Sequence, residues 1–173
     1  TISVDSDCCN SLFSLQGFEQ RQDKLSIPTS LTSTTNRHCG FTPSQDQCWG
    51  VDWLISMLDL LRDQPANAPA LILSGGETTV TVRGNGKGGR NTEFTLSLLE
   101  ALQGEEGISA IAVDTDGIDG TEDNAGAWID QNSFLKAKQL KLKANDFLDN
   151  NDAYSFFQQL EQLVLTGPTM TNV

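Results

Sequence analysis

The amino-acid sequence predicts an α/β protein in which a mixed β-sheet is flanked by helices. Short apolar and β-branched runs alternate with longer stretches of helical spacing, which is typical of this class. A glycine-rich loop and an acidic loop each follow a predicted strand. Ligands of α/β proteins commonly bind at such strand ends, so the two loops are expected to form the ligand edge of the sheet.

The chain is expected to divide near residue 48. Residues 1–48 are rich in Ser, Thr, Asn and Gln and lack sustained periodicity, which predicts an irregular or diverged segment. The four cysteines lie in this segment at a spacing that matches no common zinc motif, so we expect reduced thiols. Residues 49–173 have the patterning of one folded domain.

The elements of this second region are predicted in chain order. Residues 51–61 have helical spacing, and Pro65 and Pro69 follow as helix breakers. The strands and helices expected beyond them are the strands Ala70–Leu73 and Thr78–Val82 joined by a turn at Ser74–Gly76, the helix Thr92–Leu102, the buried strand Ile108–Val113, and the helices Ser133–Leu140 and Tyr154–Leu163 separated by the polar turn Asn150–Asp152.

Charge and hydropathy exclude several classes of partner. The formal net charge of -12 would repel nucleic acid backbones and anionic lipid surfaces. The sequence has no signal-peptide pattern and no apolar run near the ~20 residues of a membrane span. We therefore expect a cytoplasmic protein that binds neither nucleic acid nor membrane.

The first candidate site is the loop Gly84–Asn91, which places four glycines and the cations Lys87 and Arg90 between a strand and a helix. Glycines allow close backbone approach, and amides at a helix N-terminus favour anions, so the loop suits phosphate. The loop also fits the GxGxxG pattern, but Asp114 lies too far along the chain for a dinucleotide fingerprint. A flexible hairpin remains the alternative interpretation.

The second candidate site is the acidic loop Asp114–Asp123, with carboxylates at the end of a predicted strand. A hard cation, the cations of the glycine loop, or solvent could neutralise them, and the sequence leaves these open. Two weaker candidates are the Ser74–Thr79 turn with Glu77, and Thr166–Thr169, for which an ordinary turn is favoured.

Four segments resemble, in the same order, the MOFRL domain of the class II glycerate kinases, also called the glycerate 2-kinase or hydroxypyruvate reductase-like family. They are LSGGETTVTVRGNGKGGRNTEF from Leu73, AVDTDGIDGTEDNAGAW from Ala112, NNDAYSFF from Asn150 and LVLTGPTMTNV from Leu163. The resemblance covers roughly residues 51–173. It implies ATP-dependent phosphorylation of D-glycerate at its 2-hydroxyl to give 2-phosphoglycerate, with Mg²⁺ as the metal.

The resemblance also suggests roles for the candidate residues. Arg90, together with Lys87, would hold negative charge on substrate or phosphate, because a guanidinium can bind an oxyanion through two parallel bonds. The expected catalytic residues are Arg90, Asp116 and Asp119; the expected substrate or phosphate contacts are Glu77, Gly86, Lys87, Gly88, Gly89, Asn91 and Glu93; and the expected metal ligands are Asp114 and Asp116. The division of roles among the carboxylates stays open.

Two departures from the family qualify this expectation. Family members carry an N-terminal Rossmann-like domain with a functional lysine, which residues 1–48 do not resemble, and continue past the end of this chain. The chain therefore looks truncated at both ends, and its expected partners are a complementing N-terminal domain or a second copy in a homodimer. The alternative functions are a non-catalytic remnant that binds phosphate, glycerate or a partner, and a hydroxypyruvate reductase-type oxidoreductase.

Overall fold

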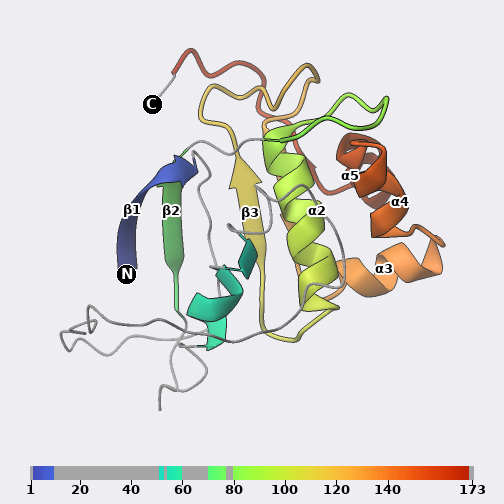
Figure 1. Cartoon of the computed structure of the whole chain (residues 1–173), viewed down its shortest axis with the longest axis horizontal. Coiled ribbons are helices and arrows are strands. Elements are labelled where there is room, and N and C mark those ends of the chain that lie inside the picture. Colours follow the sequence, from blue (N-terminus) through green and yellow to red (C-terminus); the bar gives the residue numbers. More distant parts are fainter. Residues whose placement is uncertain (1, 10–50, 53, 60–69, 77–79, 172–173) are drawn as a thin grey trace.

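The computed structural model describes residues 2–9, 51–52, 54–59, 70–76 and 80–171. Its strands form two small sheets, and its helices pack mainly on the second of them. Figure 1 shows β1 and β2 side by side, with β3 and α2 central and α3, α4 and α5 beyond them. The predicted α/β class with flanking helices is confirmed, and the described strands divide the expected mixed sheet into one parallel and one antiparallel sheet.

The first sheet joins two segments that are distant in the sequence. Strand β1 (Ile2–Cys9) pairs in parallel with β2 (Ile72–Gly76), and Ile2 lies opposite Ile72. The expectation of irregular structure over residues 1–48 is wrong for Ile2–Cys9, while residues 10–48 lie outside the described part. The turn expected at Ser74–Gly76 is also wrong, because these residues end β2.

The strand expected at Thr78–Val82 is not formed over residues 80–82, which have no regular structure. Residues 78 and 79 lie outside the described part. The strand is not formed because the next main-chain amide is already hydrogen-bonded to another part of the chain. The N–H of Arg83 donates to the Asn151 side chain at 2.6 Å instead of to a neighbouring strand. β-branched residues favour strands only where a partner strand is present.

The second sheet is antiparallel and has the order β3-β4-β5. Strand β3 (Ala110–Val113) pairs with β4 (Gly126–Ile129), which pairs with β5 (Leu163–Val164). Gly126 is required at its position because a Cβ there would lie 1.9 Å from the carbonyl oxygen of Ala112. The acidic loop therefore connects two adjacent strands, β3 and β4.

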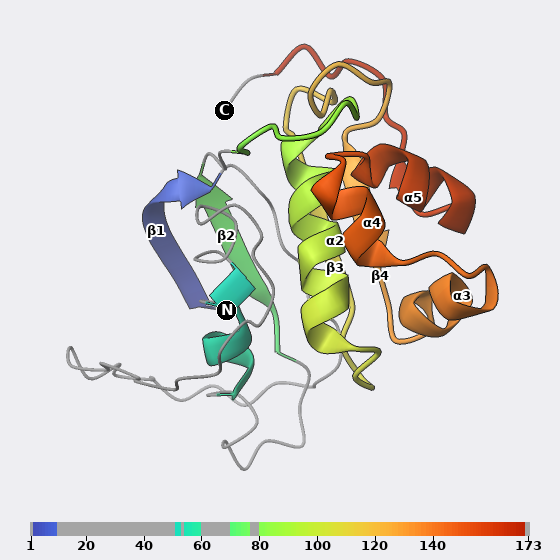
Figure 2. The same ribbon diagram turned by 45° about the vertical axis from the view of Figure 1, so that its right-hand side comes forward.

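Helix α2 (Arg90–Leu102) is the central helix of the domain and starts two residues before the predicted Thr92. It contacts β3 and β4 and also α4 and α5, and every residue from 91 to 99 is buried. Figure 2 shows α2 crossing in front of β3 with α4 and α5 beside it. Because both of its faces are covered, its N-terminal end has a fixed position relative to the end of β3.

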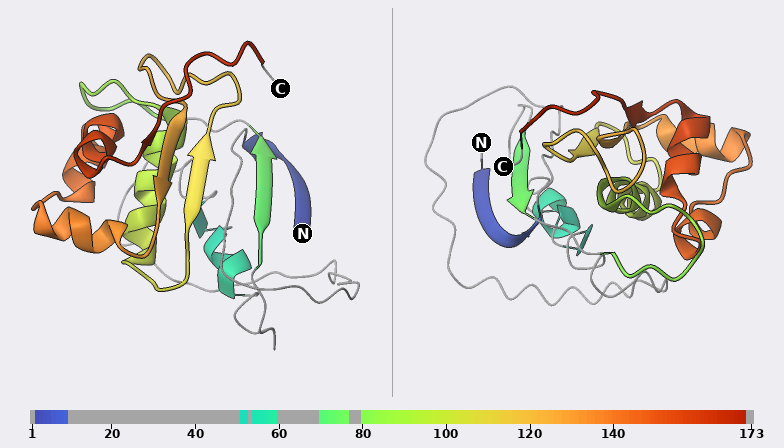
Figure 3. Two further views of the ribbon diagram at one scale, coloured as in Figure 1. Left: turned by 180° about the vertical axis from the view of Figure 1, so that it is seen from behind. Right: turned by 90° about the horizontal axis from the view of Figure 1, so that it is seen from above.

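The remaining helices close the core on the far side of α2. They are α3 (Ser133–Gln139), α4 (Ala144–Asp149) and α5 (Ala153–Leu160), of which α4 was not predicted. Phe156 is fully buried and makes edge-to-face contacts with Phe147 and Phe157, each with ring centroids 5.4 Å apart. Figure 3 shows, from behind and from above, how these helices flank α2.

The predicted helix after residue 50 is present at residues 51–52 and 54–59, and its side chains Val51, Leu54 and Leu58 join the core. The expected helix end near Pro65 and Pro69 lies outside the described residues. In the part of the chain that the structure describes, no helix is long and apolar enough to cross a membrane.

Candidate functional site

The glycine loop is held by the turn between α4 and α5. The Asn151 side-chain oxygen accepts the N–H groups of Arg83 and Gly84 at 2.6 and 3.0 Å, and the Asn150 side-chain oxygen accepts that of Asn85 at 3.1 Å. The main-chain carbonyls of Asn150 and Asn151 accept the N–H groups of Gly86 and Gly88 at 2.8 and 2.9 Å. Five main-chain amides between residues 83 and 88 therefore bind the protein itself.

Two of the loop glycines are explained by this contact. A Cβ at Gly84 would lie 2.2 Å from the carbonyl oxygen of Asn150, and one at Gly86 would lie 2.1 Å from that of Asn151. Such separations are impossible without moving the backbone, so both positions need glycine for packing. Gly86 and Gly88 had been expected to offer amides to phosphate, whereas their N–H groups point to the Asn150–Asn151 turn.

The far end of the loop turns sharply into α2. Gly88 and Gly89 have φ values of 74° and 104°, which glycine adopts readily. A Cβ at Gly89 would lie 2.3 Å from the Thr92 hydroxyl and 2.8 Å from a carboxylate oxygen of Asp119. The corner that carries Arg90 into the helix is thus shaped by the acidic loop.

Asp119 binds the N-terminus of α2. One of its oxygens accepts the N–H of Asn91 at 2.9 Å and the Asn91 side-chain amide at 3.3 Å. The other accepts the N–H and hydroxyl of Thr92 at 2.8 and 3.0 Å. Asp119 is 1% exposed, and burial raises its pKa although these hydrogen bonds lower it. A carboxylate at this point also balances the positive end of the helix dipole.

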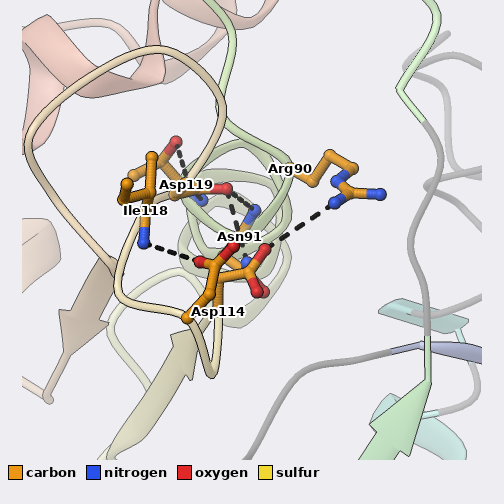
Figure 4. Close-up of polar contacts among 7 residues, drawn as sticks. Arg90, Asn91, Asp114, Ile118 and Asp119 are labelled. Carbon is orange, nitrogen blue, oxygen red and sulfur yellow. Dashed lines mark hydrogen bonds and ion pairs between the residues drawn. The ribbon is translucent and has the colours of Figure 1, made fainter. Parts of the chain in front are cut away.

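Arg90 and Asp114 face one another across the two loops. The guanidinium of Arg90, at the first residue of α2, lies 3.7 Å from a carboxylate oxygen of Asp114, directly after β3 (Figure 4). The Arg90 side chain is 40% exposed and that of Asp114 is 13% exposed. Burial and the charge of Asp116 raise the pKa of Asp114, whereas Arg90 lowers it. An anionic group from solvent can therefore reach Arg90 while Asp114 orients it.

The first turn of the acidic loop is held from two directions. The Asp116 side chain accepts the N–H of Ile118 at 2.9 Å, and its main-chain carbonyl accepts the N–H of Thr169 at 2.8 Å. The hydroxyls of Thr169 and Thr171 donate to the carbonyl of Thr115 at 2.5 and 2.9 Å. Thr169, in the segment Thr166–Thr169 for which an ordinary turn is favoured from the sequence, and the nearby Thr171 therefore both bind the acidic loop.

The second half of the acidic loop makes two surface contacts. Lys87 forms an ion pair with Glu122 at 2.9 Å, and the Lys87 side chain is 69% exposed. The Tyr154 hydroxyl donates to Asp123 at 2.9 Å. The ion pair joins the tip of the glycine loop to the acidic loop, so the cations of one loop each face a carboxylate of the other.

Glu93 lies inside the domain instead of facing solvent. It is 1% exposed, and one of its oxygens accepts the N–H of Ala153, the first residue of α5, at 3.2 Å. The other oxygen is buried without a hydrogen-bond partner among the described residues. Burial raises the pKa of Glu93 to about 7, although the hydrogen bond from the Ala153 N–H lowers it.

The structure thus brings most of the predicted site residues together, but in different settings. Arg90 and Asp114 face each other, while Asn91 and Asp119 pair at the start of α2 and Glu93 is buried behind it. Glu77 lies outside the described residues. Within the described ranges, no three His, Cys, Asp or Glu side chains gather as a metal-binding group.

Sequence reasoning missed several residues that shape the site. The sequence indicates Asn150 and Asn151 as turn residues that can cap the next helix, and it does not single out Thr92 and Thr169 as contacts of the acidic loop. A usable signal existed for Asn151: its φ of 53° is a left-handed conformation that asparagine adopts more readily than most residues. Which loop it binds could not be read from the sequence.

Curated relatives match a little under two thirds of the chain. A putative hydroxypyruvate reductase of Agrobacterium vitis is 51% identical over 111 residues, covering 63% of this chain and 25% of that protein. The D-glycerate 2-kinase of Thermotoga maritima is 45% identical over 115 residues, covering 65% of this chain and 27% of that protein. The glycerate kinase of Rattus norvegicus is 40% identical over 116 residues, covering 62% of this chain and 22% of that protein. The chain thus spans about a quarter of the length of these relatives.

Solved structures and a family model agree with these relatives. The crystal structure of glycerate kinase from Thermotoga maritima matches with a TM-score of 0.68 and 38% identity, covering 74% of this chain and 31% of that one. The crystal structure of a Pyrococcus horikoshii protein matches with a TM-score of 0.66 and 32% identity, covering 74% of this chain and 30% of that one. The MOFRL family model matches residues 70–173, which include both loops and the Asn150–Asn151 turn, and the chain accordingly belongs to the MOFRL family.

Proposed function

We propose that this chain supplies one wall of the active site of an ATP-dependent kinase that phosphorylates D-glycerate at its 2-hydroxyl. The supporting observation is the pairing of Arg90, at the start of a rigid buried helix, with Asp114 at the end of β3. The names of the Thermotoga and rat relatives give the reaction class. The rest of the active site would come from a region that those longer relatives contain.

Arg90 is the residue to which we assign anion binding. Phosphoryl transfer needs fixed positive charge near the transferring group, and a guanidinium can bind a carboxylate or phosphoryl group through two parallel hydrogen bonds. Its partial exposure allows contact with substrate, and Asp114 limits its orientations. Lys87 adds a second, more exposed cation at the tip of the glycine loop.

The acidic loop fits a magnesium ion. Asp114 and Asp116 interact closely enough for the charge of Asp116 to raise the pKa of Asp114, so the two carboxylates repel each other unless a cation lies nearby. Magnesium usually takes one or two protein carboxylates and completes its shell with phosphate oxygens and water. We propose Asp114 and Asp116 as its ligands, where the ion would neutralise charge on the phosphates of ATP. One of the two carboxylates would also position the glycerate hydroxyl.

Asp119, Asn91 and Glu93 are better suited to positioning roles. Both oxygens of Asp119 bind the N-terminus of α2, and Asn91 supplies two of those hydrogen bonds. Glu93 is buried on the same helix. In this proposal Asp119 fixes the acidic loop against the helix that carries Arg90, instead of contacting substrate.

The test is a chimera, because the chain covers only part of its relatives. Residues 70–173 replace the matching part of the Thermotoga D-glycerate 2-kinase, and ADP formation from Mg-ATP is measured with and without D-glycerate. The chain alone is assayed beside it. We expect glycerate-dependent turnover in the chimera. The Arg90→Ala substitution should lower that turnover rate on the order of a hundredfold. Lys141→Ala, a substitution at an exposed position between α3 and α4, is the matched control.

Each outcome distinguishes the candidate functions. A folded chimera with no turnover would contradict the kinase proposal and favour a binding remnant, which equilibrium dialysis with glycerate and phosphate would detect. Oxidation of NADH with hydroxypyruvate is measured in parallel, because an Agrobacterium relative carries a reductase name. Reductase activity without kinase activity would replace the proposal.

A further inference from the structure

Residues 114–117 form a tight turn that carries two of the carboxylates after β3. The N–H of Gly117 donates to the carbonyl of Asp114 at 3.2 Å and closes the turn. The Asp116 side chain accepts the N–H of Ile118, the next residue, at 2.9 Å. The directions in which Asp114 and Asp116 project therefore depend on how the peptide groups of this turn are oriented.

The middle peptide group of the turn is held by hydroxyls from the segment 166–171. The hydroxyls of Thr169 and Thr171 donate to the carbonyl of Thr115 at 2.5 and 2.9 Å, and they lie 2.7 Å from each other. Each hydroxyl has one hydrogen, so one of them can donate to the other while the second donates to Thr115. In each arrangement the Thr115 carbonyl has at least one donor.

The same segment binds and covers the rest of the turn. The N–H of Thr169 donates to the carbonyl of Asp116 at 2.8 Å. A Cβ at Gly117 would lie 2.2 Å from the carbonyl oxygen of Gly167, and Gly117 is buried. Figure 2 shows the chain after β5 passing the loop that follows β3. The turn is thus enclosed by a segment about fifty residues further along the chain.

We propose that Thr169 is a positioning residue that, together with Thr171, fixes the shape of the turn and so the separation of its two carboxylates. A β-turn changes type when its middle peptide group flips, and such a flip would turn the Thr115 carbonyl away from both hydroxyls. It would also require a positive φ at Asp116, which is costly for a residue other than glycine. The relevance of this turn to metal binding rests on the proposed function.

The test is amide hydrogen exchange of the purified chain, followed by NMR for individual amides. Thr169→Val and Thr171→Val each remove one hydroxyl at nearly constant shape, and both positions are exposed, so the fold should survive. In the double variant, the Gly117 and Ile118 amides should exchange on the order of tenfold faster. The Asp119 amide is bound to a carbonyl later in the same loop and should keep its rate.

Two further variants supply the controls. In the Thr171→Val background, Thr169→Ser keeps a hydroxyl that can hold the Thr115 carbonyl, so the Gly117 amide should exchange at the rate of Thr171→Val alone. Thr166→Val changes the same segment but removes a hydroxyl that donates locally to the carbonyl of residue 167, so it should leave the turn unchanged. Because either hydroxyl can serve Thr115, the double variant should exceed the product of the two single effects.

In the active chimera, the double variant should change the dependence on magnesium. At fixed ATP, it should raise the Mg²⁺ concentration for half-maximal turnover on the order of tenfold, with a smaller change in kcat at saturating Mg²⁺. The reason is that two carboxylates held at a less definite separation bind a cation less tightly. Thr169→Ser in the Thr171→Val background should keep the magnesium dependence of Thr171→Val alone.

Several results would overturn the proposal. They are wild-type exchange of the Gly117 amide in a folded double variant, equally fast exchange in Thr166→Val, or an active chimera whose magnesium dependence the double variant leaves unchanged. An inactive chimera would instead contradict the proposed kinase function. In that case, exchange in the chain alone would still decide whether Thr169 fixes the turn.

Discussion

Asp119 and Thr92 are joined by two hydrogen bonds to the same carboxylate oxygen, one from the Thr92 main chain at 2.8 Å and one from its hydroxyl at 3.0 Å. Residues 27 positions apart thereby fix the acidic loop to the helix that carries Arg90. Asp119→Ala should lower the free energy of unfolding by about 2–4 kcal/mol, because it leaves buried donors without an acceptor. Urea unfolding followed by circular dichroism measures the change.

The control for this prediction is Asp123→Ala in the same loop. Asp123 is exposed and accepts a hydrogen bond from the Tyr154 hydroxyl at the surface, so its loss should change stability by less than about 0.5 kcal/mol. Equal losses in the two variants would show that Asp119 has no special structural role.

The raised pKa of Glu93 predicts a specific dependence of stability on pH. An acid whose pKa is raised from 4.5 to about 7 on folding binds its proton more tightly in the native state. The unfolded chain therefore releases that proton first, and stability falls as the pH rises from 4.5 to about 7. Above pH 7 the ionisation of Glu93 lowers the free energy of unfolding by a constant amount of about 3 kcal/mol.

Glu93→Gln cannot ionise and should remove this component. The difference in unfolding free energy between variant and wild type should grow in favour of the variant between pH 4.5 and 7, while contributions from other carboxyls such as Asp119 largely cancel. Parallel stability curves for the two proteins would mean that Glu93 ionises in the folded chain at its ordinary pKa.

The loop glycines should respond unequally to alanine. Gly86→Ala places a Cβ 2.1 Å from a main-chain oxygen of Asn151 and should destabilise by about 1–3 kcal/mol or more. Gly75→Ala in β2 meets nothing within 4 Å, so its effect should stay within about 0.5 kcal/mol. Thermal melts of the two variants compare them directly, and similar melting temperatures would contradict the packing of the loop on the Asn150–Asn151 turn.

Arg90 should control the titration of Asp114. Because the guanidinium lowers the pKa of that carboxyl, Arg90→Gln should raise the Asp114 pKa further above its ordinary value. Carboxyl ¹³C chemical shifts recorded against pH report this directly. Lys87→Gln removes a cation that pairs with Glu122 and should leave the Asp114 titration unchanged. An unaltered Asp114 pKa in Arg90→Gln would remove the electrostatic basis of the proposed site.

Elements with strong periodicity could be predicted from the sequence. Helix α2 and strand β3 have dense apolar patterns that match one secondary structure over most of their length. Strands β4 and β5 are not predicted because four and two residues are too few to show a period. Pairing with a neighbouring strand makes them strands: β4 pairs with β3, and β5 pairs with β4. The β-branched residues 80–82 do not form the predicted strand. The side-chain oxygen of Asn151 accepts the next two main-chain N–H groups, those of Arg83 and Gly84, which a partner strand would otherwise bind.

The site could be located from the sequence but not resolved into roles. Glycines and cations beside a helix start, and carboxylates after a strand, correctly indicated two loops that meet. The sequence could not show that Asp119 would bind the helix N-terminus or that Glu93 would face the interior, because both depend on contacts between distant segments. A carboxylate that binds backbone and one that faces a cation look the same in a one-dimensional pattern.

The contact between Gly117 and Gly167 has a consequence for the order of folding. A Cβ at Gly117 would lie 2.2 Å from the Gly167 carbonyl oxygen, so the acidic loop takes its final shape only against a segment fifty residues later. Contacts of such sequence separation carry a larger loop-closure entropy than those within α2 or the β3–β4 pair. The domain should therefore nucleate around its central helix and sheet, and the carboxylates after β3 should be ordered in one of the last steps.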